Sequence, residues 1–281
     1  MDKKTFKLHT ENHNRDIFES KYIYPVLSRR AGGLSLGINL NTNNACNWQC
    51  IYCEVPNLTR GKPDPIDLNL LRIELQDWLK NLVEGDFIEK HTDPDTKFKD
   101  IALSGNGEPT ACKEFKSVLR IIEEEFTACK CPTDIKIRLI TNGSYLSEKE
   151  IAAAWRGLSL EKEIWFKIDS TQSDKIKIIN QVNLTTKQIK KNLESALAVS
   201  PTIIQTCLTK INNQLPSANE IQDYVNFLKP YENQINSIHL YSLARPTEQK
   251  TAFTLERLTN QEMTQIADKM DTLSIPIFTF S

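Results

Sequence analysis

Short apolar runs alternate with stretches of helical periodicity along most of the chain. The apolar runs have the length of strands and are bounded by polar or turn-forming residues. Between them, apolar residues recur every three or four positions, as they do on the buried face of an amphipathic helix. The pattern predicts strands at 34–40, 100–105, 135–142, 163–170, 202–208 and 237–243, and helices at 67–83, 113–126, 147–156, 186–199 and 217–229.

This alternation predicts a mostly parallel sheet. A strand followed by a helix, repeated along the chain, implies right-handed crossovers between parallel strands. Six such units are fewer than the eight of a closed barrel, so we predict an α/β fold, a partial (β/α)6 barrel. The barrel would span residues 34–246 as one core domain. It would lie between a short polar N-terminal extension at 1–33 and a C-terminal extension at 247–281, which contains a helix and an apolar strand.

Composition and charge narrow the classes of protein only a little. With 281 residues, 40% of them hydrophobic, the chain can bury one sizeable core. The formal net charge of −1 predicts no overall attraction to nucleic acid or to a membrane surface. The polar N-terminus has no apolar segment of the signal-peptide type, and no later run approaches the roughly 18 apolar residues of a membrane span. We therefore expect a soluble, cytoplasmic protein with no membrane partner.

Three of the seven cysteines, Cys46, Cys50 and Cys53, lie close together in "ACNWQCIYC", just after the first predicted strand. An odd number of cysteines with one tight cluster is more typical of metal chemistry in a reducing compartment than of disulfides. Core packing is one alternative, although the polar neighbours disfavour it. Structural zinc is another, but it usually takes four ligands and no second pair follows at the usual distance. Three thiolates on a four-iron cluster would leave one iron open, and an open metal position is typical of a reactive site.

Small and polar residues gather where later predicted strands end. Ligands collect at the carboxyl ends of parallel strands, which is also where the cysteine loop begins. Ordinary turns and helix caps are the alternative interpretation. The second predicted strand ends in "SGNGEPT", with Gly105, Asn106, Gly107 and Glu108, and the third ends at Asn142.

The fourth predicted strand, "EIWFKIDS", carries Lys167 and Asp169 at alternate positions. Residues two apart on a strand share one face of the sheet. Opposite charges on an otherwise apolar strand are costly unless they are paired or bind a ligand. We therefore predict an ion pair between them, either direct or through a ligand.

The spacing C-x3-C-x2-C resembles the signature of the radical S-adenosylmethionine (SAM) superfamily. More narrowly, the chain is similar to a group of iron–sulfur oxidoreductases related to the wyosine synthase of tRNA. The resemblance covers about residues 24–183, with a weaker match at "LYSLARP". It is carried, in this order, by "YPVLSRRAGGLSLGINLN", the cysteine motif, "SGNGEPT", "ITNG" and "WFKIDSTQSDKIKIINQVN".

The resemblance implies a radical SAM enzyme with a partial barrel of that type. Cys46, Cys50 and Cys53 would bind a 4Fe-4S cluster whose open iron chelates SAM. An electron, supplied by an external reductant such as flavodoxin or ferredoxin, would cleave SAM to methionine and a 5′-deoxyadenosyl radical that abstracts hydrogen from an unidentified substrate. Glu108 would accept hydrogen bonds from the ammonium group of SAM, and Tyr52 would pack near the adenine. The full set of cofactor-binding residues implied in this way is Tyr52, Gly105, Asn106, Gly107, Glu108, Asn142, Lys167 and Asp169.

The substrate class, small molecule or RNA, stays open. A wyosine-like tRNA-modifying enzyme is one alternative, but wyosine synthase carries a second cluster on cysteines upstream of the radical motif, and this chain has no cysteine before Cys46. Outside the enzymes, the alternative is a non-catalytic iron–sulfur or zinc-binding module. Arg29, Arg30, Arg60 and Lys62 give only a weak signal for nucleic acid, and we interpret them as solvated charges.

Overall fold

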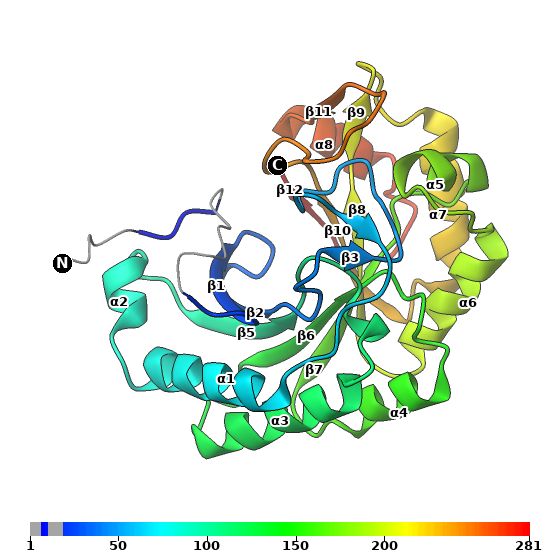
Figure 1. Ribbon diagram of the computed structural model, residues 1–281. Helices are drawn as coiled ribbons and strands as arrows, with labels where there is room; N and C mark the ends of the chain where they lie inside the picture. Colours follow the sequence, from blue (N-terminus) through cyan, green and yellow to red (C-terminus); the bar gives the residue numbers. More distant parts are fainter. Residues whose placement is uncertain (1–6, 11–18) are drawn as a thin grey trace.

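The computed structural model describes residues 7–10 and 19–281 and contains a curled sheet of eight strands (Figure 1). Neighbouring strands are parallel except β1 and β2, which form an antiparallel hairpin at one edge. In spatial order, the strands are β1 (Ile23–Ser28), β2 (Gly33–Ile38), β5 (Phe98–Leu103), β6 (Lys136–Thr141), β7 (Lys162–Lys167), β8 (Thr202–Cys207), β10 (Ile235–Tyr241) and β12 (Ile277–Phe280).

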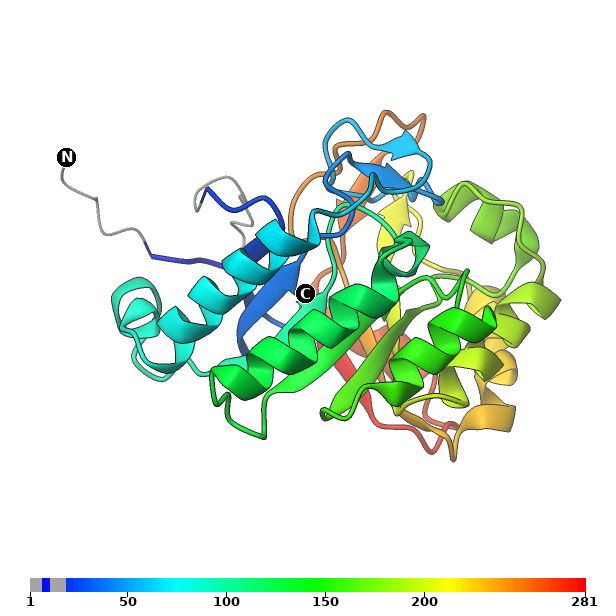
Figure 2. The ribbon, with the colours of Figure 1, turned by 60° about the horizontal axis from the view of Figure 1, so that its bottom comes forward.

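The helices cover the outer face of the curled sheet (Figures 1 and 2). Several begin at a side-chain cap: Thr185, Ser217 and Thr259 each form a reciprocal capping box with the residue three positions later. The helices are α1 (Leu68–Val83), α2 (Phe87–His91), α3 (Phe115–Ala128), α4 (Lys149–Gly157), α5 (Ser173–Ile179), α6 (Thr186–Leu197), α7 (Ala218–Leu228) and α8 (Asn260–Asp268), with 3-10 turns at Pro109–Ala111 and Lys229–Tyr231.

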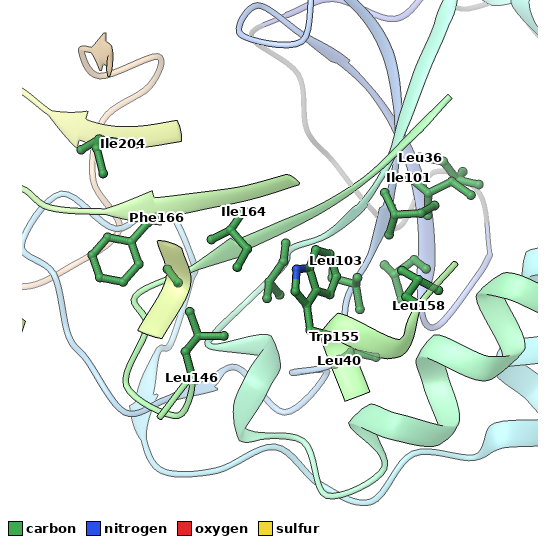
Figure 3. Packing of buried hydrophobic residues seen from close by; sticks show 14 of the residues in the cluster. Leu36, Leu40, Ile101, Leu103, Leu146, Trp155, Leu158, Ile164, Phe166 and Ile204 are labelled. Carbon is green, nitrogen blue, oxygen red and sulfur yellow. The ribbon is translucent and has the colours of Figure 1, made fainter. Parts of the chain in front are cut away.

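The main hydrophobic core lies between the sheet and these helices (Figure 3). Trp155 of α4 is fully buried there and lies near Leu103 of β5 and Ile164 of β7. Side chains on the other face of the strands point into the interior of the half-barrel. Because the helices bury the outer face, the inner face and the strand ends remain for ligands.

The predicted partial barrel is confirmed: β2, β5, β6, β7, β8 and β10 are the six expected strands, and they run parallel. The sheet differs from the prediction at one edge, because residues 23–28 form β1 within the stretch expected to be a polar extension. Part of that stretch, 1–6 and 11–18, lies outside the described residues. At the other edge, β12 pairs with β10. None of the helices in the described ranges is long and apolar enough to cross a membrane.

Candidate functional site

The cysteine loop lies across the carboxyl ends of the parallel strands (Figure 2). It leaves β2 at the end where β5, β6 and β7 also end. A two-stranded pairing of β3 (Ala45–Cys46) with β4 (Thr59–Arg60) holds the loop in shape. The Arg60 guanidinium donates to the carbonyl oxygens of Asn47 (3.0 Å) and Gln181 (2.6 Å), so it positions the loop and is not simply a solvated charge.

Cys46, Cys50 and Cys53 line one cavity of about 270 Å³. Two of the sulfur atoms accept hydrogen bonds: Cys46 Sγ from the backbone N–H of Trp48 (3.4 Å), and Cys50 Sγ from the side-chain amide of Asn180 (3.3 Å). Burial raises the pKa of Cys46 to about 12 and that of Cys50 to about 11. Without a metal, these thiols therefore keep their protons at neutral pH, and metal binding would release them.

The donor set fits an iron–sulfur cluster. No three cysteine, histidine or acidic side chains among residues 7–10 and 19–281 lie close enough together to share a single metal ion. A four-iron cluster has a different requirement, because each thiolate binds its own iron. Three thiols facing one cavity, with N–H donors directed at two of the sulfurs, provide the ligands and the hydrogen bonds that such a cluster uses.

Glu108 joins the ends of two neighbouring strands. Its carboxylate is buried, and burial raises its pKa. One carboxylate oxygen accepts from the Thr110 backbone N–H (3.1 Å) and the Thr141 hydroxyl (2.6 Å), and the other accepts from the Asn142 backbone N–H (2.7 Å). The Asn142 side chain then donates to Asn47 Oδ1 (2.9 Å) in the cysteine loop. Glu108 and Asn142 therefore connect the ends of β5 and β6 to the cysteines.

The glycines at 105 and 107 allow this strand end to approach the cysteine loop closely. Gly105 has φ +152°, and a Cβ atom there would lie 2.3 Å from Asn39 Oδ1. A Cβ on Gly107 would lie 2.2 Å from the carbonyl oxygen of Ala45, next to Cys46. Asn106 lies between them and donates its backbone N–H to Asn39 Oδ1 (3.0 Å). A side chain at Gly105 or Gly107 would therefore collide with the loop that follows β2, which explains why glycine occupies both positions.

Lys167 and Asp169 meet at Tyr52, not directly at each other. The Tyr52 hydroxyl donates to Asp169 Oδ2, and Lys167 Nζ lies 4.8 Å from the centroid of the Tyr52 ring. Asp169 also accepts from Asn180 Nδ2 (2.6 Å) and from the Cys207 backbone N–H (2.9 Å). The described residues show no direct ion pair between Lys167 and Asp169, so of the two predicted forms only the one through a ligand stays a prediction. Burial alone would lower the pKa of Lys167, but the neighbouring Tyr241 and Asp169 raise it well above its usual value.

The inner face of the sheet carries charged residues that the sequence analysis missed. Arg138 of β6 forms ion pairs with Asp100 of β5 and with Glu163 of β7 (2.6 Å). Trp165 donates its indole N–H to Glu163 (3.0 Å). These residues alternate with core residues along their strands. Because successive side chains of a strand point to opposite faces of the sheet, this alternation could have predicted that they lie on the inner face. Arg30 also reaches this interior, where it contacts Trp165, so its interpretation as a solvated charge is wrong.

No family model matches the chain. A UPF0026 protein from Helicobacter pylori strain J99 is 28% identical over 242 residues, covering 80% of this chain and 67% of that protein. The UPF0026 protein slr1464 from Synechocystis is 26% identical over 231 residues, covering 80% of this chain and 75% of that one. A Brachyspira hyodysenteriae protein named GTPase Obg is 27% identical over 177 residues, and the chain spans 22% of its length.

Solved structures share the fold at low sequence identity. A radical SAM methyltransferase from Sphaerobacter thermophilus has a TM-score of 0.59 at 12% identity, covering 92% of this chain and 68% of that one. SuiB from Streptococcus suis has a TM-score of 0.54 at 15% identity, covering 89% of this chain and 51% of that one. Another SuiB structure was solved with bound SAM. The chain therefore has the partial-barrel fold of radical SAM enzymes, with a three-cysteine loop at the carboxyl ends of its strands.

Proposed function

We propose that this chain is a radical SAM enzyme that uses a 4Fe-4S cluster bound by Cys46, Cys50 and Cys53. The observation that carries the proposal is the position of the three cysteines, spaced C-x3-C-x2-C, on one cavity at the carboxyl ends of a partial barrel. When bound, the cluster and SAM supply a 5′-deoxyadenosyl radical that abstracts hydrogen from a substrate. This chemistry consumes an electron, and we propose a protein such as flavodoxin or ferredoxin as its source.

The residues around the cysteines would bind and orient the cofactor. The backbone at 105–107 borders the same cavity as the sulfurs, and Glu108 and Asn142 fix its position relative to the cysteine loop. We propose that the methionine part of SAM lies along this segment. Tyr52, held by Asp169, lines the same cavity beside the Lys167 ammonium group. A cation there suits the carboxylate of SAM or of a second ligand.

The cavity favours a small-molecule substrate over tRNA. The site opens into an interior of about 1070 Å³, which is lined by residues from both edges of the barrel. Of the basic residues considered for RNA binding, Arg60 is engaged by backbone carbonyls and Arg29 donates to the backbone oxygen of Ser281. Two of the four basic residues that could form an RNA surface are thus engaged within the protein, which disfavours a wyosine-like reaction. Comparing the modified nucleosides of tRNA from strains with and without the gene tests this, and an unchanged profile is expected.

Anaerobic reconstitution tests the central proposal. The protein is treated with iron and sulfide, its iron and sulfide are counted, and 5′-deoxyadenosine is measured after dithionite and SAM are added. We expect about four irons per chain and formation of 5′-deoxyadenosine. Cys50→Ala should abolish both, whereas Cys129→Ala, which alters a buried cysteine of the hydrophobic core, should retain them. Tight binding of one zinc without SAM cleavage would instead indicate a binding module.

A further inference from the structure

Arg30 projects into the barrel interior from the turn between β1 and β2. It lines the 270 Å³ cavity that carries the cysteines and also the larger space behind it. Its guanidinium carbon lies 4.4 Å from the centroid of the Tyr241 ring and 5.5 Å from that of Trp165. The two aromatic rings therefore hold the guanidinium in the interior while leaving its in-plane N–H groups available.

Within the described ranges, Arg30 has no acidic partner. Its hydrogen bond goes to the neutral amide oxygen of Gln205, which uses one of the five guanidinium N–H groups. Gln205 is oriented by His239, whose Nδ1 lies 3.1 Å from Gln205 Nε2. Burial, together with the nearby Arg30 and Arg138, lowers the pKa of His239 to about 4. His239 is therefore neutral at neutral pH and accepts this hydrogen bond, which directs the Gln205 oxygen toward Arg30.

Four other charges of the inner face neutralise one another. Lys136 and Arg138 are paired with Asp100 and Glu163, so this group of four contributes no net charge. Arg30 remains as a half-buried cation beside a cavity, with most of its donors unused by the described residues. A partly buried charge without a counterion is unfavourable, and an anionic ligand would supply the missing counterion.

The geometry points to Arg30 as the residue that binds an anionic group of the substrate, a carboxylate or a phosphate. This inference rests on the proposed radical SAM function and names the class of its substrate: a small organic acid or phosphate ester. The fork of guanidinium N–H groups matches two oxygens of either anion. Lys167 lines the same cavity and borders the cysteine side at Tyr52. An anion held at Arg30 would thus leave the rest of a small substrate directed toward the cysteines.

Anion binding can be measured without knowing the substrate. The probes are inorganic phosphate and succinate, titrated calorimetrically at constant ionic strength, with glycerol as a neutral control. Modification of Arg30 by phenylglyoxal, read by peptide mass spectrometry, reports occupancy in the unaltered protein. We expect phosphate, succinate or both to bind and to protect Arg30. Arg30→Gln should weaken binding at least tenfold, Arg30→Lys should restore part of it, and Arg156→Gln, an exposed change on α4, should have no effect.

The outcomes separate this inference from the proposed function. Binding of phosphate alone indicates a phosphate ester, and binding of succinate alone indicates a carboxylic acid. The inference would be overturned if neither anion protected Arg30 from phenylglyoxal, or if Arg30→Gln bound the anions as tightly as the unaltered protein. The production of 5′-deoxyadenosine is measured separately in the unaltered protein and in Arg156→Gln, and should be the same in both. If the unaltered protein formed no 5′-deoxyadenosine, the proposed function would be overturned. The anion titration would still be interpreted independently of that result.

Discussion

Replacing Gly107 with alanine should force apart two loops of the candidate site. The new Cβ would lie 2.2 Å from the carbonyl oxygen of Ala45 and 2.5 Å from Asn41 Nδ2. These two groups are already hydrogen-bonded to each other at 2.8 Å. Ala45 and Asn41 are both buried, so neither can move into solvent to relieve the contact.

The size of the effect follows from these distances. Non-bonded heavy atoms pack at roughly 3.5 Å, so the two loops would have to separate by about 1 Å. Overpacking of this kind costs about 1–3 kcal/mol, and loss of the Asn41 hydrogen bond adds about 1 kcal/mol. We expect the free energy of unfolding to fall by about 2–4 kcal/mol. Cys46 follows Ala45 directly, so the iron content after reconstitution should fall as well.

The free energy of unfolding is measured by urea denaturation of the apo protein, monitored by circular dichroism. The iron content after reconstitution is measured by iron analysis. Gly157→Ala is the matched control, because a Cβ on this last residue of α4 meets no atom within 4 Å. Alanine favours a helix over glycine by about 1 kcal/mol, so the control should be as stable as the unaltered protein or more stable. If Gly107→Ala unfolded at the same urea concentration and bound the same amount of iron, the inferred close packing would be refuted.

Three further predictions concern polar contacts. Tyr52→Phe removes a donor to Asp169 and should lower the free energy of unfolding by about 1–2 kcal/mol, measured in urea. The pKa of His239 is about 4 in the folded protein, below its ordinary 6.5. Between these pH values only the unfolded chain takes up a proton, so the free energy of unfolding decreases as the pH is lowered, by about 2 kcal/mol at pH 5. His239→Asn should show a flatter dependence in urea titrations from pH 7 to 5. Asn180→Ala removes a donor to Cys50 Sγ and should make the cluster potential more negative, measured by a redox titration followed by electron spin resonance.

The regular elements could be predicted because their buried faces repeat with the period of a strand or helix. Residues 23–28 were missed for a physical reason: Pro25 interrupts the run, and proline within an apolar run argues against a central strand. β1 is an edge strand, where a missing N–H is tolerated. Periodicity alone does not distinguish an edge strand of this kind from an extended loop.

The residues of the candidate site also differ in how well the sequence predicts them. The cysteines and the glycines at 105 and 107 could be identified because their spacing is local in the sequence. Arg30 could not, because its partner Gln205 is 175 residues away and the two meet only when the β1–β2 turn enters the barrel. Asp169 shows the same limit: it lies just beyond β7, which ends at Lys167, and its partners come from three separate segments, which the sequence does not bring together.

The two buried carboxylates near the cysteines explain how the site can be open to ligands and still be well ordered. Glu108 and Asp169 each accept hydrogen bonds from more than one segment, and the donors to both are neutral groups. Much of their acceptor capacity is therefore used to hold strand ends and loops in place. Of the cations that line the cavity, Lys167 is stabilised by the nearby Asp169, whereas Arg30 forms no ion pair with either carboxylate. We infer that the rigid frame comes from the acids, whereas ligand charge is recognised by the cations, which favours a cofactor and a substrate that both carry anionic groups.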